Sequence, residues 1–407
     1  MGSTAVLTLN SGSSSLKLAL YEQRQRDESD AEAHVMLAGV IERIGLSESR
    51  AHVRDATGET LVEAQPNASS HQEAIRWLLN WLRSVRPLDG LAGVGHRIVH
   101  GGSDFYAPQR ITPALRDALQ RLIPFAPEHL PAEIDVIAEM ESAYPSLPQI
   151  ACFDTAFHHT KPRVAQIYGL PWEMTRQGIL RYGFHGLSYE YVLSELARDA
   201  GSETAAGRVV IAHLGNGASM AAIRDGRSLD CTMGFSPLSG LVMSTRTGNM
   251  DPGVLLYLLK ERRMTPADLR EMVSEKSGLL GVSGVSPDMR DLLAAEARGD
   301  ERASLAVDLF RYEATKQLGG LVAVLGGLDT LIFTGGIGER AAVIRQRICD
   351  GFGWLGVALD PTRNDAHAPV ISSNASQVSV RVIPTNEELM IARHTIQTLR
   401  ASDHTTT

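Results

Sequence analysis

The sequence predicts an α/β fold in which one kind of domain occurs twice, and three observations support this prediction. Residues 209–220 form a short apolar run, a turn with two glycines and an asparagine, and a second partly apolar run, which is typical of a β-hairpin. Residues 6–18 carry a similar pattern, and their Gly12 aligns with Gly217. The two patterns stand about half of the 407-residue chain apart. Two half-chains that begin with the same hairpin indicate a duplicated domain.

The second hairpin turn, at residues 215–217, has almost no side chains, so its backbone N–H groups can approach an anion closely. An ordinary hairpin turn explains either pattern alone. The repetition favours phosphate binding, because two such turns facing each other across a cleft would hold a polyphosphate from both sides. That arrangement is typical of an ATP-dependent phosphotransferase.

Length, composition and charge limit the classes of function. A chain of 407 residues is long enough for two or three domains, each with its own core. Its 43% hydrophobic and 21% charged residues are ordinary for a globular protein. The net charge of −8 argues against a nucleic-acid-binding surface, so local arginines and a metal ion would have to hold an anionic substrate.

The cysteines and the hydropathy indicate the compartment. Cys152, Cys231 and Cys349 are far apart and odd in number, which favours neither a disulfide framework nor a zinc site and suits a reducing compartment. The sequence shows no apolar run of about 18 residues and no secretory signal pattern. We therefore expect a cytoplasmic location and no membrane partner.

The first half of the chain opens with alternating apolar and polar residues at 5–22, where Lys17 follows the serines of the turn. Lys17 either reaches a phosphate oxygen or is a solvated strand lysine. Short strands are expected within residues 34–65, and apolar residues at helical spacing predict a helix over 71–82.

The next strand ends at Arg97, shortly before a glycine pair. Arginine carries a rigid fork of N–H donors that suits a carboxylate or a phosphate, and ligands of open α/β sheets bind at strand ends. A structural salt bridge is the alternative. His129 follows in a proline-punctuated loop before an expected helix, as a substrate donor or as a helix-start residue.

Asp154 follows a buried-looking strand, which makes it a candidate magnesium partner or base. The nearby His158 and His159 do not indicate a metal site, because adjacent residues of a strand point to opposite faces. His185 stands among glycines and aromatic residues just before a helix, a confined setting for a hydrogen-bond donor.

In the second half, a long loop over residues 236–253 contains Arg246, a second candidate phosphate arginine. Helices are expected at about 253–275 and 300–326. Residues 283–291, between them, are expected to form a loop on the nucleotide side, because an aspartate can bind a ribose hydroxyl and an arginine can stack on a base.

Residues 331–339 predict a strand, a glycine-rich turn and a helix start, which together present backbone N–H groups to an anion. They do not match the P-loop, because no Gly-Lys-Ser/Thr follows. A last helix is expected from about Glu387, where capping alone explains the acidic residues of the first turn.

The chain resembles the acetate kinase family over nearly its whole length, in four motifs that occur in this order: NSGSSSLK at 10–17, HRIVHGG at 96–102, FDTAFH at 153–158 and NEE at 386–388. The resemblance implies the duplicated fold shared by sugar kinases, heat-shock ATPases and actin, with a cleft between the domains. It also implies a homodimer and a reversible, in-line phosphoryl transfer from ATP to acetate, with Mg²⁺ or Mn²⁺.

The resemblance further implies domain limits and site residues. The first domain would comprise residues 1–155 and 387–407, and the second, nucleotide-binding domain residues 156–386. Arg97 would hold the substrate carboxylate, and His129 would be a donor to it. The residues that would line the pocket for the alkyl group are Val99, Phe184 and Pro237.

The remaining roles that the resemblance implies concern the phosphoryl group, the metal and the nucleotide. His185 and Arg246 would stabilise the transferring phosphoryl group, and Asp154 would be the essential acid. Asn10 and Glu387 would form the magnesium end. The residues that would bind the nucleotide are Lys17; His213, Leu214, Gly215, Asn216 and Gly217; Asp288, Met289 and Arg290; and Gly336, Ile337, Gly338, Glu339 and Arg340.

Four positions depart from the family pattern. Glu128 stands for a leucine, Leu130 for an asparagine, Ser239 for a glutamate and Arg340 for an asparagine. These departures leave the type of reaction intact but leave the acid open, so propionate or a longer acid is an alternative to acetate.

An alternative of a different class is a nucleotide-switch protein of the same fold without an acyl acceptor. Arg97, Phe184 and His185 argue against it, because a switch needs no second anion site beside the γ-phosphate. A carboxylate nucleophile is already ionised at pH 7 and needs no general base. Asp154 is therefore expected to act on the metal or on an orienting partner.

Overall fold

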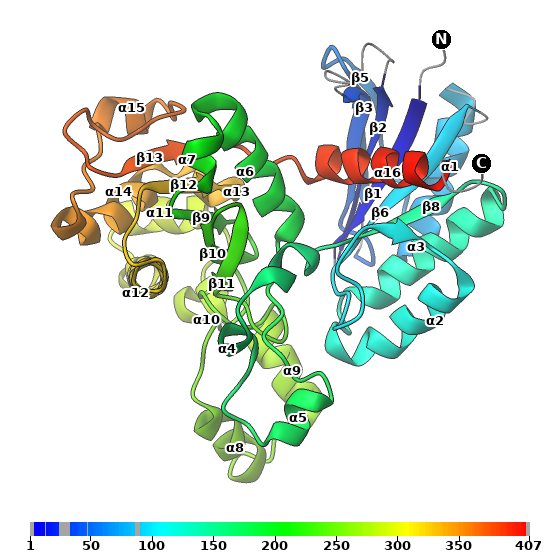
Figure 1. The fold of residues 1–407 in the computed structure, drawn as a ribbon. Coiled ribbons are helices and arrows are strands. Elements are labelled where there is room, and N and C mark those ends of the chain that lie inside the picture. Colours follow the sequence, from blue (N-terminus) through cyan, green and yellow to red (C-terminus); the bar gives the residue numbers. More distant parts are fainter. Residues whose placement is uncertain (1–3, 13, 24–32, 47, 86–89, 404–407) are drawn as a thin grey trace. The chain divides into compact units, whose positions relative to one another are not determined.

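The computed structural model describes residues 4–12, 14–23, 33–46, 48–85 and 90–403, so that Ser13 of the first hairpin turn lies outside it (Figure 1). The chain divides into two compact units. The first unit comprises Met1–Ala156 and Asn386–Thr407, and the second unit comprises Phe157–Thr385. Each unit is built around one mixed β-sheet.

Within the described residues, the first unit contains an eight-stranded sheet in the order β5-β4-β3-β2-β1-β6-β8-β7. Its strands are β1 (Thr4–Ser11), β2 (Ser15–Gln23), β3 (Ala33–Glu42), β4 (Arg50–Asp55), β5 (Thr60–Ala64), β6 (Leu91–Ile98), β7 (Gln109–Arg110) and β8 (Gln149–Phe153). β1 to β5 are antiparallel neighbours, whereas β6 and β8 extend the sheet in parallel from β1. The hairpin expected at 5–22 and the short strands expected within 34–65 are confirmed.

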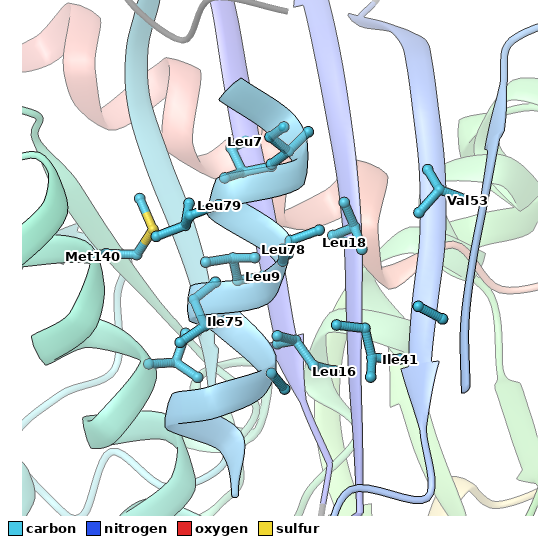
Figure 2. Packing of buried hydrophobic residues seen from close by; sticks show 14 of the residues in the cluster. Leu7, Leu9, Leu16, Leu18, Ile41, Val53, Ile75, Leu78, Leu79 and Met140 are labelled. Carbon is cyan, nitrogen blue, oxygen red and sulfur yellow. The ribbon is translucent and has the colours of Figure 1, made fainter. Parts of the chain in front are cut away.

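The two faces of this sheet are covered by helices from distant parts of the chain. Successive residues of a strand point to opposite faces. Leu7 therefore packs toward α1 (His71–Val85), in the core that Figure 2 shows, whereas Val6 packs with Ile396 of α16 (Glu387–Asp403) in a smaller core. The last helix thus belongs to the first unit.

Two further helices of the first unit follow the strand end at β6. They are α2 (Pro113–Leu122), which η1 (Ile123–Phe125) extends, and α3 (Leu130–Ala143). α2 begins behind Thr112, whose hydroxyl accepts from the backbone N–H of Leu115. α3 packs on α1 and on β6, so its first turn lies near the carboxyl end of β6.

The second unit contains, among the described residues, a five-stranded sheet in the order β11-β10-β9-β12-β13. Its strands are β9 (Val209–Leu214), β10 (Ala218–Arg224), β11 (Arg227–Cys231), β12 (Thr330–Thr334) and β13 (Ser379–Val382). The helical segments of this unit are η2 (Ala156–Thr160), α4 (Arg163–Gln166), α5 (Trp172–Arg176), α6 (Gly186–Ala200), α7 (Ser202–Ala206), α8 (Pro252–Lys260), α9 (Pro266–Glu275), α10 (Gly278–Ser283), α11 (Met289–Ala297), α12 (Glu301–Leu325), α13 (Gly335–Arg340), α14 (Ala342–Cys349), η3 (Asp350–Leu355) and α15 (Pro361–Asp365).

The two sheets share one topology. In the first unit β3-β2-β1 are antiparallel and β6 and β8 continue in parallel; in the second unit β11-β10-β9 are antiparallel and β12 and β13 continue in parallel. The predicted duplication of an α/β domain is confirmed.

Two expectations about the second unit are wrong. The helix expected at about 253–275 is two helices, because Thr265 caps α9 with a reciprocal pair of bonds to Asp268 and Pro266 starts the new helix. The loop expected at 283–291 already contains the first turn of α11, since Asp288 caps that helix. Within the part of the chain that the structure describes, no helix is long and apolar enough to cross a membrane.

Candidate functional site

Asn10 lies near the carboxyl end of β1 and is 6% exposed. Its side-chain amide donates to Glu387 Oε2 at 3.0 Å and to Glu388 Oε1 at 3.1 Å. Lys17 is the register partner of Asn10 on β2, and its Nζ lies 3.8 Å from Glu388 Oε1. The first turn of α16 therefore brings two carboxylates to the end of the first hairpin.

This group fits a magnesium ion. Mg²⁺ usually binds one or two carboxylates together with water and substrate phosphates. Glu387 and Glu388 supply two carboxylates, and Asn10 holds both of them through its Nδ2. Asn10 and Glu387 were expected from the sequence, whereas Glu388 was not assigned. The described part of the chain holds no cluster of three or more His, Cys, Asp and Glu side chains that could bind a metal.

Arg97 and Asp154 form a buried ion pair at the adjacent ends of the parallel strands β6 and β8. Nη2 of Arg97 lies 2.5 Å from Asp154 Oδ2 and Nε lies 3.1 Å from it; the two side chains are 12% and 0% exposed. Burial lowers the pKa of Arg97, but Asp154, Glu387 and Glu133 outweigh that effect and raise it.

The ion pair leaves N–H donors of Arg97 for a substrate. A guanidinium has five donors, and within the described residues Arg97 directs only Nε and Nη2 to Asp154. The salt bridge that the sequence left as an alternative is therefore present and is compatible with anion binding. Asp154 orients the guanidinium.

Glu133 lies in the first turn of α3 and is 2% exposed. Its two carboxylate oxygens accept from the backbone N–H of Val99 at 3.0 and 3.2 Å. Burial is the main reason that the pKa of Glu133 rises to about 8. His129 precedes α3, and its carbonyl accepts from the N–H of Glu133 at 3.2 Å. The structure thus joins Arg97, Val99 and His129 through a residue that the sequence did not single out.

The other histidines beside Arg97 are structural. His96 is 2% exposed, and burial lowers its pKa to about 4. His100 is fully buried, stands edge-on to Phe125 at 5.5 Å, and accepts from the N–H of Gly102 at 2.9 Å. Both rings therefore support the strand end and its turn.

In the second unit, Gly217 brings two candidate catalytic residues together. A Cβ atom on Gly217 would lie 3.3 Å from His185 Nε2 and 3.5 Å from Arg246 Nη1. His185 precedes α6 with a φ of 60°, and its Nδ1 lies 2.8 Å from Ser219 Oγ on β10. Arg246 donates from Nη1 to the carbonyl of Pro237 at 3.3 Å. The turn of the second hairpin therefore lies against an imidazole and a guanidinium.

His213 supports this arrangement from β9. Its ring stacks on His185 with 4.2 Å between the ring centres. Its Nδ1 lies 2.8 Å from Ser188 Oγ, which in turn lies 2.8 Å from Thr385 Oγ1. These contacts fix the position of the His213 ring against the ring of His185. Leu214 is fully buried, so its side chain belongs to the core.

Phe184 is 1% exposed, and its carbonyl accepts from Nε2 of His158 at 2.9 Å. Burial, followed by Lys161, lowers the pKa of His158 to about 3. His158 is therefore a neutral, structural residue. A Cβ on Gly183, whose φ is 87°, would lie 2.7 Å from that ring, so the chain approaches His158 at a glycine.

The glycine-rich turn after β12 packs against the second hairpin. Gly335 has a φ of 76°, and a Cβ there would lie 2.9 Å from the carbonyl oxygen of Leu214. A Cβ on Gly215 would lie 3.9 Å from the backbone nitrogen of Gly336. Gly336 itself is exposed and has open space where a side chain would be. The two candidate phosphate-binding turns are therefore neighbours, with Asn216 between the two hairpin glycines.

Glu339 and Arg345 hold α13 in place. Glu339 accepts from the N–H groups of Gly335 at 2.9 Å and Thr385 at 3.2 Å, so its carboxylate caps its own turn. Arg345 is fully buried and donates to the carbonyls of Gly338 and Glu339, each at 2.9 Å. Ile337 is half-buried and Arg340 is exposed.

Asp288, Met289 and Arg290 lie at a helix start rather than in an extended loop. Asp288 accepts from the N–H of Arg290 at 2.8 Å, and its carboxylate pairs with Nη2 of that arginine at 2.5 Å. The side-chain bond from Arg290 lowers the pKa of Asp288. Met289 is 3% exposed and belongs to the core.

Two of the departures from the family pattern have structural reasons. Leu130 is fully buried on α3, and Ser239 accepts from the N–H of Gly234 at 2.8 Å. Glu128 is half-buried, one residue before His129.

Comparisons with known proteins extend over both units. The family model described as acetokinase family matches residues 5–393. A protein of Rhodopseudomonas palustris named acetate kinase is 48% identical over 397 residues, which covers 96% of this chain and 98% of that protein. The crystal structure of Porphyromonas gingivalis acetate kinase matches with a TM-score of 0.85 at 37% identity and covers 97% of this chain and 100% of that one. A propionate kinase from Francisella tularensis matches with a TM-score of 0.87 at 35% identity, over 96% and 98%.

Proposed function

The chain belongs to the acetokinase family, and on that premise we propose that it transfers a phosphoryl group from ATP to acetate, giving acetyl phosphate and ADP in a reversible reaction. Because the chain belongs to this family, it is a phosphotransferase. This argues against the alternative of a nucleotide-switch protein. The observation that carries the proposal is the meeting of Gly217, His185 and Arg246, which supplies a phosphate-binding turn and two donors.

Arg97 is proposed to bind the acid. Its donors that Asp154 does not use suit a carboxylate, and Asp154 keeps the guanidinium in place. His129 would donate a further hydrogen bond, and the alkyl group of the acid would contact Val99. Phe184 and Pro237 are proposed to complete the contact with the acid, by analogy with the family.

His185 and Arg246 are proposed to stabilise the phosphoryl group in transfer. A carboxylate oxygen of acetate forms the new bond to the γ-phosphorus while the bond to the β,γ-bridging oxygen breaks, and that oxygen leaves with ADP. No proton moves, because acetate is ionised at pH 7. Negative charge spreads over the three equatorial oxygens, and preorganised donors lower the barrier by holding that charge.

The nucleotide is proposed to bind at the second unit. The backbone of residues 213–217 and the exposed Gly336 would hold its phosphates, and Asp288 with Arg290 would contact the adenosine. At the first unit, Asn10 and Glu387 would hold Mg²⁺ or Mn²⁺, with Glu388 beside them. When bound, the ion neutralises phosphate charge and orients the phosphates. Lys17, whose Nζ lies 3.8 Å from Glu388 Oε1, is proposed to reach a phosphate oxygen of the nucleotide.

A hydroxamate assay tests the proposal. Purified protein is incubated with ATP, Mg²⁺ and a panel of C1 to C4 acids, and hydroxylamine traps the acyl phosphate. We expect acyl hydroxamate from acetate in an ATP-dependent manner. Absence of product from every acid in the panel would disprove an acyl kinase.

Propionate is the second candidate substrate, because the propionate kinase of Francisella tularensis matches over nearly the whole chain. The same assay can test whether Glu128 affects the choice of acid. A half-buried carboxylate beside a substrate carboxylate is unfavourable, so Glu128→Leu should lower the acid KM modestly without changing the ATP dependence. A large loss of activity would instead give Glu128 a catalytic role.

A homodimer is proposed from the family and is supported by α8. This helix has no buried residue, and its exposed apolar side chains are Val254, Leu256, Tyr257 and Leu259. A contiguous exposed apolar surface commonly marks a protein interface. Leu256→Glu should shift the sedimentation coefficient from dimer to monomer, and a wild-type monomer would contradict the proposal.

We place the enzyme in the cytoplasm, where ATP is available and where its three free cysteines stay reduced.

A further inference from the structure

Glu133 occupies a position on α3 where the helical pattern calls for an apolar residue. The buried face of this helix otherwise includes Leu130, Ile134 and Ile137. A carboxylate in such a place destabilises the fold unless a partner compensates it. An acid there needs compensating contacts, and Glu133 has them.

The carboxyl group of Glu133 holds one peptide unit of the strand end. The peptide between Ile98 and Val99 donates its N–H to Glu133 and accepts, at its carbonyl, from the N–H of Asp154 at 2.9 Å. A peptide unit tied at both ends has no freedom to rotate. Arg97 stands one residue earlier, and its backbone is held by the pairing of β6 with β8, where Arg97 is the register partner of Cys152.

Asp154 closes the arrangement. Its backbone N–H holds the carbonyl of Ile98, and its carboxylate holds the guanidinium of Arg97. Arg97 is thus constrained at its backbone and at the tip of its side chain. Glu133 attaches this closed loop of contacts to α3 through the N–H of Val99.

Glu133 also positions His129. The backbone N–H of Glu133 donates to the carbonyl of His129 at 3.2 Å, as the first intrahelical bond of α3. One residue therefore contacts, through its side chain or its backbone, Val99 and His129, and it acts electrostatically on Arg97. These are the three residues proposed for the acid-binding side of the first unit.

We propose that Glu133 is the positioning residue of the acid-binding side, which holds Arg97, Val99 and His129 in the geometry that receives the substrate carboxylate. This inference rests on the proposed acyl kinase function and adds a determinant of the KM for the acid.

The charge of Glu133 decides how well a carboxylate can bind. With Arg97 positive and Asp154 negative, a neutral Glu133 leaves the group with no net charge, whereas an ionised one makes it negative and repels the substrate. Arg97 on β6 lowers the pKa of Glu133 and Asp154 after β8 raises it, but burial is the larger effect and brings the pKa to about 8. The neutral form therefore predominates at pH 7.

No other charged side chain competes for Glu133 within the described residues of the packed helices. Arg76 of α1 pairs with Glu139, and Arg116 of α2 pairs with Glu141, both further along α3. Glu387 of α16 acts on Arg97. The histidines near this group are His96 and His100, which are buried at and after the end of β6, and His129, whose carbonyl accepts from the backbone N–H of Glu133.

The test compares Glu133→Ala and Glu133→Gln with a matched control, Glu141→Gln, which removes an exposed charge from the same helix. Saturation curves for acetate and for ATP are measured at about pH 7 and about pH 9 on the full-length protein. Glu133→Ala should raise the acetate KM about tenfold and leave the ATP KM within about twofold, because the N–H of Val99 loses its acceptor. Glu141→Gln should match the wild type.

Glu133→Gln keeps an acceptor for Val99 but cannot ionise. It should keep the acetate KM of the wild type at pH 7 and should lack the increase that the wild type shows between pH 7 and pH 9. Equal increases in the two proteins would overturn the inference, and so would an unchanged acetate KM in Glu133→Ala. If Glu133→Ala does not fold, the pH profile of Glu133→Gln decides alone. Acyl phosphate formation by the wild type is measured before any variant. If the wild type forms none, the proposed function is wrong, and the role of Glu133 is not the cause.

Discussion

The two hairpins that open the two units share a topology and differ in what surrounds their turns. The end of β1 meets carboxylates, since Asn10 contacts Glu387 and Glu388. The turn between β9 and β10 meets donors, since Gly217 lies against His185 and Arg246. One duplicated backbone therefore carries opposite chemistry, with carboxylates at the first hairpin and hydrogen-bond donors at the second.

The arginines of the two units differ in the same way. Arg97 is part of a buried ion pair with Asp154, whereas Arg246 donates to the carbonyl of Pro237. The first arginine thus serves the fold as well as the acid binding that we propose for it. We expect that replacing each arginine by alanine will separate its contribution to stability from its contribution to activity.

The largest expected effect is that of Arg97→Ala. It should lower the free energy of unfolding by about 3–5 kcal/mol, because breaking a buried pair leaves Asp154 charged and without its cation. It should also abolish saturation by acetate. Urea unfolding and acetate titration measure the two effects. Adding Asp154→Asn should restore much of the stability but none of the acid binding, and wild-type stability of the single variant would show that the pair is not structural.

Arg246→Ala should lower kcat by about 10²–10³, the cost of about 2.7–4 kcal/mol that loss of a charge-stabilising donor brings. Its unfolding curve should stay close to that of the wild type, in contrast to Arg97→Ala. Steady-state kinetics and thermal unfolding are the measurements, with the exposed Arg262→Ala of the same unit as control. A kcat near the wild-type value would remove Arg246 from the catalytic group.

The two hairpin glycines should respond unequally to alanine. A methyl group on Gly217 would crowd His185 and Arg246, and we expect about tenfold lower kcat, because small displacements of reacting groups are costly. A methyl group on Gly12 would crowd Oγ of Ser15, at 2.7 Å, which can turn away, and would lie at an ordinary contact distance of 3.7 Å from the carbonyl oxygen of Ser15. Its expected change is below about twofold. Equal losses in both variants would mean that the two turns have equivalent roles.

The last expected effect concerns stability and pH. The folded-state pKa of Glu133 is raised to about 8 from an ordinary 4.5, so folding favours its protonated form. The unfolded chain releases this proton at lower pH, and the stability of the wild type falls as pH rises from about 4.5 to about 8. Glu133→Gln should escape this loss. The difference between the urea midpoints of the two proteins should therefore shift in favour of the variant between pH 5 and pH 8, and a constant difference would contradict the raised pKa.

Local patterns in the sequence were sufficient for much of this molecule. Alternating residues at 5–22 predicted the first hairpin, because successive residues of a strand point to opposite faces. In the structure β1 is buried on both faces, since Leu7 packs in one core and Val6 in the other. The apolar spacing of 71–82 predicted α1 for the corresponding helical reason. The repeated hairpin indicated the duplicated sheet, and the four motifs led to the family.

The repeat was nevertheless imperfect in detail. Ser11 pairs with Leu16 across the first turn, whereas Leu214 pairs with Ala218 across the second, so the second turn is shorter. One constant offset between the half-chains therefore does not align both strands of both hairpins. The length of a turn can change without altering the order of the strands. The duplication is therefore visible in the order and direction of the strands, and not in a constant spacing of residues.

By itself, the sequence determined the hairpins, the helix periodicity, the order of the motifs and hence the family. Tertiary structure decided which polar groups are paired and buried. Glu133 stands 34 positions from Val99, and Arg345 closes the end of α13 within a buried network. The helical pattern places Glu133 on the apolar face of α3, but the local sequence does not show which groups either side chain meets. The physical reason is that the pKa and the role of a polar side chain depend on the groups that packing brings around it, and those groups come from distant segments of the chain.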